Sequence, residues 1–115
     1  MDECELDRLL SGLGIERGIG RKYIHEAMIM DPHGKAKLQD IYLALGEKHG
    51  AKPNTVRSAI GRAIKQAYKN PATALMIRYF SPSLLPAKTP TNKQFLHRLV
   101  LILEAKEQKG GKSNA

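Results

Sequence analysis

The sequence predicts an all-α fold, a compact six-helix domain that contains a helix-turn-helix. Two observations predict it. Apolar residues recur every three or four positions over most of the 115 residues, which is the spacing that gives a helix one apolar face. No segment alternates β-branched residues strictly enough to place a strand. The length suits one domain, which we expect over residues 1–105, with a flexible, basic tail over residues 106–115.

Three helices are expected before residue 50, and glycines separate them. The apolar stripe of the first helix is Leu6, Leu9, Leu10 and Leu13. Gly12 and Gly14 end that helix. The stripe of the second helix is Tyr23, Ile24, Ala27, Met28 and Met30. The turn sequence Asp-Pro-His-Gly at residues 31–34 ends it. The third helix closes between Gly46 and Gly50, and its stripe is Leu38, Ile41, Tyr42 and Leu45.

The fourth helix begins near residue 53. Either Pro53 is its first helical residue or Asn54 is its N-cap, and the sequence Asn-Pro at residues 70–71 ends it. Its apolar stripe is Val56, Ala59, Ile60, Ala63, Ile64, Ala67 and Tyr68.

Two more helices are expected towards the C-terminus. A short fifth helix is predicted over residues 73–79, followed by a proline-rich extended connection over residues 81–90. Thr91 and Asn92 are suited to cap the last helix. The apolar residues of that helix are Phe95, Leu96, Leu99, Val100, Ile102 and Leu103.

The net charge of +8 is unevenly distributed. Residues 1–34 carry −3, residues 35–70 carry +6 and residues 71–115 carry +5. A basic middle region indicates a polyanionic partner, and nucleic acid is favoured over a membrane surface. No apolar run approaches the roughly 20 residues of a membrane helix, and the N-terminus is acidic where a signal peptide would be basic.

Enzymatic chemistry has little support in the sequence. The single cysteine, Cys4, cannot form an internal disulfide, which fits a reducing compartment such as a bacterial cytoplasm. His25 and Glu26 begin a zinc-protease pattern, but Ile29 stands at its second histidine, so we interpret them as an exposed pair on a helix. The glycines at residues 12–18 do not match a dinucleotide loop because Arg17 replaces the third glycine. We expect no catalytic residue, no metal site and no cofactor.

The segment 37–70 matches the layout of a helix-turn-helix, in which the second helix enters the major groove of DNA. With its apolar stripe inward, the helix from Pro53 turns six residues outward: Asn54, Arg57, Ser58, Gly61, Arg62 and Lys65. Arginine can hold a guanine edge with two hydrogen bonds, asparagine can do the same for adenine, and serine is a short contact to either. The residues suited to neutralise phosphates are Lys52, Lys65 and Lys69.

Gly61 is unusual in the middle of this helix, because glycine there costs about 1 kcal/mol relative to alanine. The cost is understandable if a backbone approaches closely at that point. The sequence leaves open whether that backbone belongs to DNA or to another helix.

Three blocks of residues are similar to a known family. They are residues 14–30, which include Tyr-Ile-His-Glu-Ala-Met-Ile-Met; residues 55–64; and residues 90–95, which begin Pro-Thr-Asn. In this order the chain resembles the C-terminal DNA-binding effector domain of stage 0 sporulation protein A, a sporulation response regulator. The resemblance implies a six-helix domain that binds a short DNA box through a central helix-turn-helix. It also implies head-to-tail pairing of two domains on tandem boxes and contact with an RNA polymerase sigma factor.

Five residues of the chain fall on the DNA-facing surface of that family: Thr55, Arg57, Ser58, Gly61 and Arg62. Ser58 and Gly61 stand where the family usually has arginines that read bases, and Arg57 stands where it usually has glutamate. We therefore expect a shifted or relaxed DNA specificity. The family's regulators also carry a receiver domain, for which this chain has no room, so we expect an excised domain or a stand-alone relative.

The sequence supports one alternative function. A protein-interaction or dimerisation module could keep this fold and lose or alter base reading. Ser58 and Gly61 motivate it, together with the apolar last helix, which could pair with a partner or with a second copy.

Overall fold

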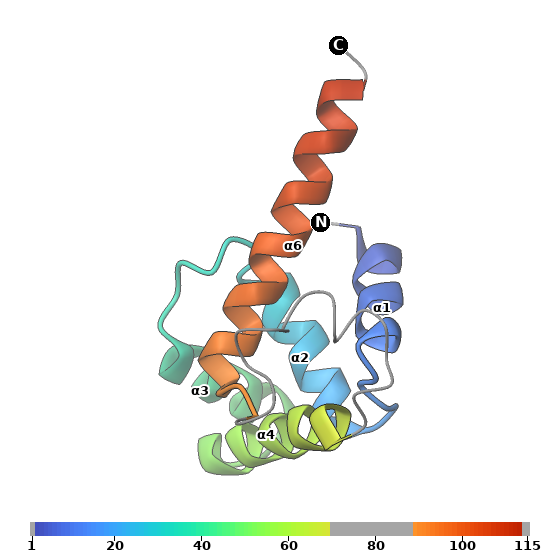
Figure 1. Ribbon diagram of the computed structural model, residues 1–115. Coiled ribbons are helices and arrows are strands. Elements are labelled where there is room, and N and C mark those ends of the chain that lie inside the picture. The colour runs from blue at the N-terminus through green and yellow to red at the C-terminus, as the bar shows by residue number, and fades with distance from the viewer. Residues whose placement is uncertain (1, 70–88, 114–115) are drawn as a thin grey trace.

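The computed structural model describes residues 2–69 and 89–113, and helices are the only regular elements in those two stretches (Figure 1). They are α1 (Glu3–Gly12), α2 (Ile19–Met30), α3 (Leu38–His49), α4 (Pro53–Lys69) and α6 (Asn92–Ser113). The all-α prediction is confirmed. These residues hold five helices rather than the six predicted, and the predicted helix over residues 73–79 lies outside them, as do residues 81–88 of the predicted connection.

The predicted turns end α1, α2 and α3 where the sequence placed them. α1 stops at Gly12. After α2, the backbone N–H of Gly34 donates to the carbonyl of Asp31 at 3.2 Å, as expected for the turn at residues 31–34. The Asp31 carboxylate then accepts the backbone N–H groups of Lys35 and Ala36, each at 2.9 Å. That carboxylate therefore holds the loop that leads into α3.

One apolar core joins the helices. The predicted stripes of α1 and α6 are fully buried, including Leu13, which follows α1 directly. Met30 is the exception on α2, because its side chain is 47% exposed. Met30 is the last residue of α2, so it lies beyond the part of that helix covered by its neighbours. In the other stripes, Leu38, Ala63 and Tyr68 are partly buried and pack against the core.

The apolar face of α6 belongs to this core. Phe95 and Leu99 have no exposed surface, and Val100, Ile102 and Leu103 are buried with them. Among the large apolar side chains of α6 that the structure describes, only Leu101 is markedly exposed. The residues that could have paired with a partner are thus covered by the domain itself.

Among the described helices, α2 and α4 pack against each other most closely, at Gly20. A Cβ atom added at Gly20 would lie 2.5 Å from the carbonyl oxygen of Ala59 and 2.8 Å from the Cβ of Ala63. Real Cβ atoms do not approach other atoms so closely, so only glycine fits. The small residues Ala59 and Ala63 complete the contact from α4. This close packing sets the short distance between the axes of α2 and α4.

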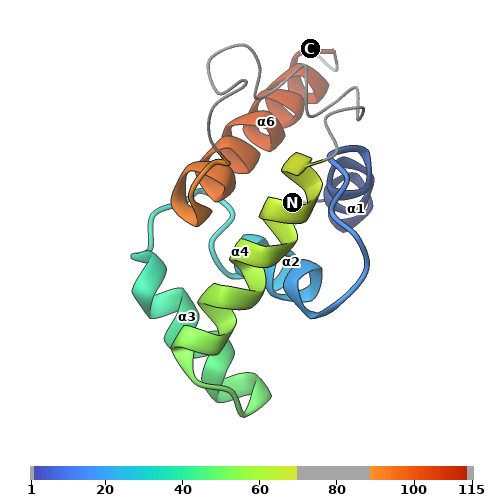
Figure 2. The same ribbon diagram turned by 60° about the horizontal axis from the view of Figure 1, so that its bottom comes forward.

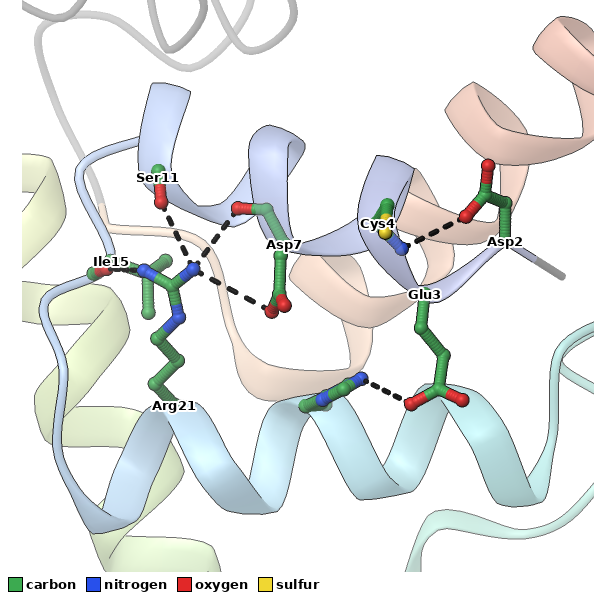
Figure 3. Close-up of polar contacts among 8 residues, drawn as sticks. Asp2, Glu3, Cys4, Asp7, Ser11, Ile15 and Arg21 are labelled. Atoms are coloured by element: carbon green, nitrogen blue, oxygen red, sulfur yellow. Dashed lines mark hydrogen bonds and ion pairs between the residues drawn. The ribbon is translucent and has the colours of Figure 1, made fainter.

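Arg21 holds α1 against α2 (Figure 3). Its guanidinium donates to the backbone carbonyls of Ile15, at 2.9 Å, and Asp7, at 3.0 Å, and to the hydroxyl of Ser11, at 2.9 Å. The Asp7 carboxylate lies 3.6 Å away. Nearby, His25 Nε2 lies 3.3 Å from Glu3. Arg21 is therefore a structural residue, with three of its five N–H donors used in joining α1 to α2.

Glu26 links α2 to the end of α3. One carboxylate oxygen lies 2.5 Å from Lys48 Nζ and the other lies 2.5 Å from His49 Nε2. The His49 ring also packs edge-on against Tyr23, with ring centroids 5.4 Å apart. Burial raises the pKa of Glu26, but the hydrogen bonds and charges of Lys48 and His49 outweigh it and hold the pKa below its ordinary value. The prediction of an exposed His25–Glu26 pair was wrong, because both side chains are half-buried and each has its own partner.

α6 begins with the predicted cap. The Thr91 hydroxyl accepts the backbone N–H of Gln94 at 3.1 Å, and the Gln94 side chain accepts the backbone N–H of Thr91 at 2.9 Å. This reciprocal pair is a capping box. α6 continues through residues 106–113, and the flexibility predicted for residues 106–115 stays a prediction. None of the described helices is both long and apolar enough to cross a bilayer.

Candidate nucleic-acid interface

α4 lies at one side of the molecule, at the bottom in Figure 1, and comes forward in Figure 2, in front of α2 and beside α3. Its inner face is formed by Val56, Ala59, Ile60, Ile64 and Ala67, which are buried. The side chains predicted to face outward do so. The exposed ones are Asn54, Thr55, Arg57, Ser58, Arg62, Lys65 and Lys69, and Gly61 is half-buried among them.

Every charged residue on the outer face of α4 is basic. α4 contains four basic residues and no acidic residue, and Lys52 precedes it. Among the residues that the structure describes, none of these five cations, namely Lys52, Arg57, Arg62, Lys65 and Lys69, forms an ion pair. Because residues three or four positions apart are neighbours on a helix surface, Arg62, Lys65 and Lys69 place like charges side by side.

A tight turn joins α3 to α4. Gly50 ends α3 with a φ of 64°, a left-handed conformation that favours glycine. The carbonyl of Gly46 then accepts the backbone N–H of Ala51 at 2.8 Å. A Cβ at Gly46 would overlap the Ala51 carbonyl oxygen, so this turn requires both glycines. α4 starts at Pro53, which resolves the alternative left by the sequence and leaves the Asn54 side chain exposed in the first turn.

A depression lies where α3 meets the start of α4. Its lining combines three predicted site residues with three others: Lys52, Asn54 and Arg57, then Gln39, Tyr42 and Pro53. Gln39 and Tyr42 were not predicted as site residues. Gln39 could have been found, since it lies in the first turn of α3 next to the inward Leu38 and must face outward. Tyr42 was assigned to the core stripe, and it is indeed buried.

The remaining predicted residues extend away from that depression. A helix rises about 1.5 Å per residue, so Lys69 lies about 18 Å along α4 from Arg57. Side chains so far apart cannot read the same few base pairs. The structure thus separates an N-terminal group, around Lys52, Asn54 and Arg57, from a C-terminal group, Lys65 and Lys69.

Gly61 lies on the outer side of α4, and within residues 2–69 and 89–113 no backbone atom of another helix lies within 4 Å of a Cβ added there. Among the described residues, the only atom within 4 Å of a Cβ added there is Oδ1 of Asn92, at 3.5 Å, an ordinary van der Waals distance. The part of the chain that the structure describes therefore gives no support to a close approach of another helix backbone at Gly61, and a close approach of DNA stays a prediction. The close helix approach occurs at Gly20 instead.

Comparison with known protein families assigns the chain to one family. The family model described as sporulation initiation factor Spo0A, C terminal, matches residues 6–103. The chain belongs to this family. Membership in the Spo0A C-terminal family confirms the resemblance seen in the sequence. No curated protein and no solved structure matches the chain significantly.

The Spo0A C-terminal domains are a family of DNA-binding effector domains and not an enzyme family. The match covers every described helix in whole or in large part, including all of α3 and α4. Within the described residues, no group of three or more His, Cys, Asp or Glu side chains is placed to hold a metal ion.

Proposed function

We propose that the chain is a sequence-specific DNA-binding transcription regulator that inserts α4 into the major groove. The observation that carries the proposal is the outer face of α4, whose cations have no ion-pair partner among the described residues and no acidic neighbour within the helix. A surface of this kind attracts phosphates and gains entropy when it releases their counterions. Membership of a DNA-binding family supports the same function.

In this proposal α3, the turn at residues 50–52 and α4 form the helix-turn-helix. The N-terminal turns of α4 read bases, with Arg57 and Arg62 on guanine edges, Asn54 on adenine, and Ser58 and Thr55 as short contacts. Lys52, Lys65 and Lys69 contact phosphates, which position the domain and carry no sequence information. Gly61 lets a DNA backbone or base edge come close to α4.

The same face supports an altered specificity. Ser58 and Gly61 replace two arginines that the family usually uses to read bases, and each such bidentate contact contributes about 1–3 kcal/mol of discrimination. Arg57, where the family usually has glutamate, adds a cation in the first turns of α4. We therefore propose that the preferred DNA box differs from the usual sporulation box or is less strictly read.

Further proposals about pairing, partners and location rest on the resemblance to the family. We propose that two copies pair head-to-tail on tandem boxes, that the bound domain contacts an RNA polymerase sigma factor, and that the protein works in the bacterial cytoplasm at the nucleoid. Domain boundaries at residues 1–105 and 106–115 belong to the same proposal. None of these statements is needed for the central one, that α4 reads DNA.

Selection of bound sequences from random DNA, run with the chain at 50 mM and 200 mM salt, tests the proposal. We expect one enriched motif at both salt concentrations. Binding should weaken with salt with a slope of about −0.9 for each phosphate contacted. Failure to bind any DNA at 50 mM salt would overturn the proposal. If the chain then formed a defined dimer in solution, the alternative of a protein-interaction module would be supported.

A further inference from the structure

Asn92 connects three helices with one side-chain nitrogen. Asn92 is the first residue of α6. Its Nδ2 donates one hydrogen bond to Tyr42 Oη on α3, at 2.9 Å, and another to the backbone carbonyl of Arg57 on α4, at 3.1 Å. An amide nitrogen has two protons, so both are used in holding α6 to the helix pair.

The orientation of this amide follows from its partners. A backbone carbonyl can only accept a hydrogen bond, so the atom that faces Arg57 must be the nitrogen. Asn92 is also not needed as a helix cap, because Thr91 and Gln94 already form the capping box of α6. The side chain of Asn92 is thus free to act between helices rather than within its own.

The contact lies directly beside the proposed DNA-reading face. Asn92 Oδ1 lies 3.5 Å from the position of a Cβ at Gly61, and Gly61 is one helical turn after Arg57. Asn92 therefore bonds to the backbone of α4 at Arg57 and lies beside the next turn, at Gly61. The inner side of α4 is held by apolar contacts, whose energy depends little on the exact orientation of the helix because hydrophobic contacts are non-directional. Among the polar contacts described, Asn92 alone ties the backbone of α4 to the start of α6.

We propose that Asn92 is a positioning residue that fixes the rotation of α4 about its own axis and thereby sets how strictly the domain discriminates between DNA sequences. The inference rests on the proposed function. When an arginine reads a base through two hydrogen bonds (a bidentate contact), its side chain must be held within about 0.5 Å and 10–20° of the productive geometry. Phosphate contacts tolerate small rotations, since they depend mainly on charge. Loss of Asn92 should therefore reduce selectivity much more than nonspecific affinity.

The test compares Asn92→Ala with Gln94→Ala. Gln94→Ala removes one of the two capping-box hydrogen bonds at the same helix start, the one that the Gln94 side chain accepts. It leaves the bridge to α4 intact, so it controls for weakening of α6. For each folded variant, affinity for the selected DNA box and for an unrelated duplex is measured at the same salt concentration. We expect Asn92→Ala to lower the ratio of the two affinities about tenfold, the value of one base contact. The nonspecific affinity and the salt slope should stay unchanged, and Gln94→Ala should keep the wild-type ratio.

Tyr42→Phe is the second variant, and it keeps the inference testable if Asn92→Ala does not fold. It removes one acceptor of the Nδ2 group and keeps the aromatic ring in the core. We expect a smaller drop in the affinity ratio, because the bond to Arg57 remains. Asn92→Asp should behave like Asn92→Ala or worse, since a carboxylate would face the Arg57 carbonyl without a proton to donate.

The outcomes separate the two proposals. If the wild-type chain binds no DNA, the proposed function fails and the role of Asn92 fails with it. If the wild-type chain selects a DNA box and the Asn92 and Tyr42 variants keep the wild-type affinity ratio, only the role of Asn92 is overturned. Equal losses in Asn92→Ala and Gln94→Ala would also overturn it, because they would reduce Asn92 to a stabiliser of α6.

Discussion

The junction of α1, α2 and α3 and the outer face of α4 use basic residues in opposite ways. At the junction, Arg21 donates to three oxygens and lies near Asp7, and Lys48 and His49 both contact Glu26. On α4, no cation has an ionic partner among the described residues. The charge of a segment alone therefore does not identify a binding surface. Lys48 contributes to the +6 of residues 35–70 and is already neutralised within the fold.

The difference has an energetic consequence. Like charges three or four positions apart destabilise a helix by a few tenths of a kcal/mol per pair, and α4 has such spacings at Arg62, Lys65 and Lys69. The paired cations at the junction have no such cost. A polyanion would relieve the repulsion on α4, whereas it would have to displace existing partners at the junction. Substitutions in the two regions should consequently affect different measurements.

The largest effect is expected from Arg57→Ala and Arg62→Ala in DNA binding. Each should weaken binding to the selected DNA box by about 1–3 kcal/mol and change the preferred sequence, if the guanidinium contacts a base. Fluorescence anisotropy with the selected duplex measures the affinity. Lys22→Ala is the matched control, because it removes one exposed cation that belongs to α2 rather than to the outer face of α4. Unchanged affinity and preference in both arginine variants would exclude α4 as the reading helix.

The next effect is expected from Arg21→Ala, and it should appear in stability rather than binding. The substitution removes three hydrogen bonds that join α1, the loop at residue 15 and α2, so the free energy of unfolding should fall by about 1–2 kcal/mol. DNA affinity of the folded protein should be unchanged. Urea unfolding measures the first quantity and anisotropy the second. A loss of affinity with intact stability would contradict the division between the two regions.

Much of this fold could be predicted because it depends on local pattern. The apolar stripes identified the inner faces of all five described helices, and the turn chemistry at residues 31–34 and 50 marked where α2 and α3 end. The outward position of Arg57, Ser58 and Arg62 followed from the stripe, since a helix with one buried face must expose the other. Met30 was misplaced because the spacing of a stripe does not show where neighbouring helices stop covering it.

The rest could not be predicted because it depends on which residues meet across the fold. Glu26 and His49 are 23 positions apart, and Asn92 and Tyr42 are 50 apart. No sequence periodicity links such residues. Asn92 was predicted as a cap, and Gly20 was given no role, because the parts that both residues play arise from contacts with α4. The low helix propensity of glycine marked Gly61 as unusual, but only the structure shows that Asn92 lies beside it.

A smaller effect, of opposite sign in the two measurements, is expected from Gly61→Ala. Among the residues that the structure describes, an alanine Cβ at position 61 meets one atom, Asn92 Oδ1, at the ordinary distance of 3.5 Å. The free energy of unfolding should therefore rise by about 0.5–1 kcal/mol. If DNA approaches α4 closely at this position, affinity for the selected duplex should fall. Thermal unfolding and anisotropy measure the two changes. A stabilised variant with undiminished affinity would show that glycine is not needed for DNA approach.

The smallest effect concerns the pH dependence of the junction. The hydrogen bonds from Lys48 and His49 hold the pKa of Glu26 below its ordinary value when the protein is folded, whereas the unfolded chain has the ordinary value, near 4.3. Glu26 therefore stabilises the fold above that pH, and this stabilisation is lost as the pH falls towards the lower pKa of the folded state. The pair is open to water on the Lys48 side, so the loss should stay below about 1 kcal/mol.

Urea unfolding between pH 3 and 7 should show a shallower pH dependence for Glu26→Gln than for the wild type. Glu47→Gln removes an exposed carboxylate of α3 that has no partner among the described residues, and it should keep the wild-type profile; identical profiles for both variants would mean that Glu26 does not contribute.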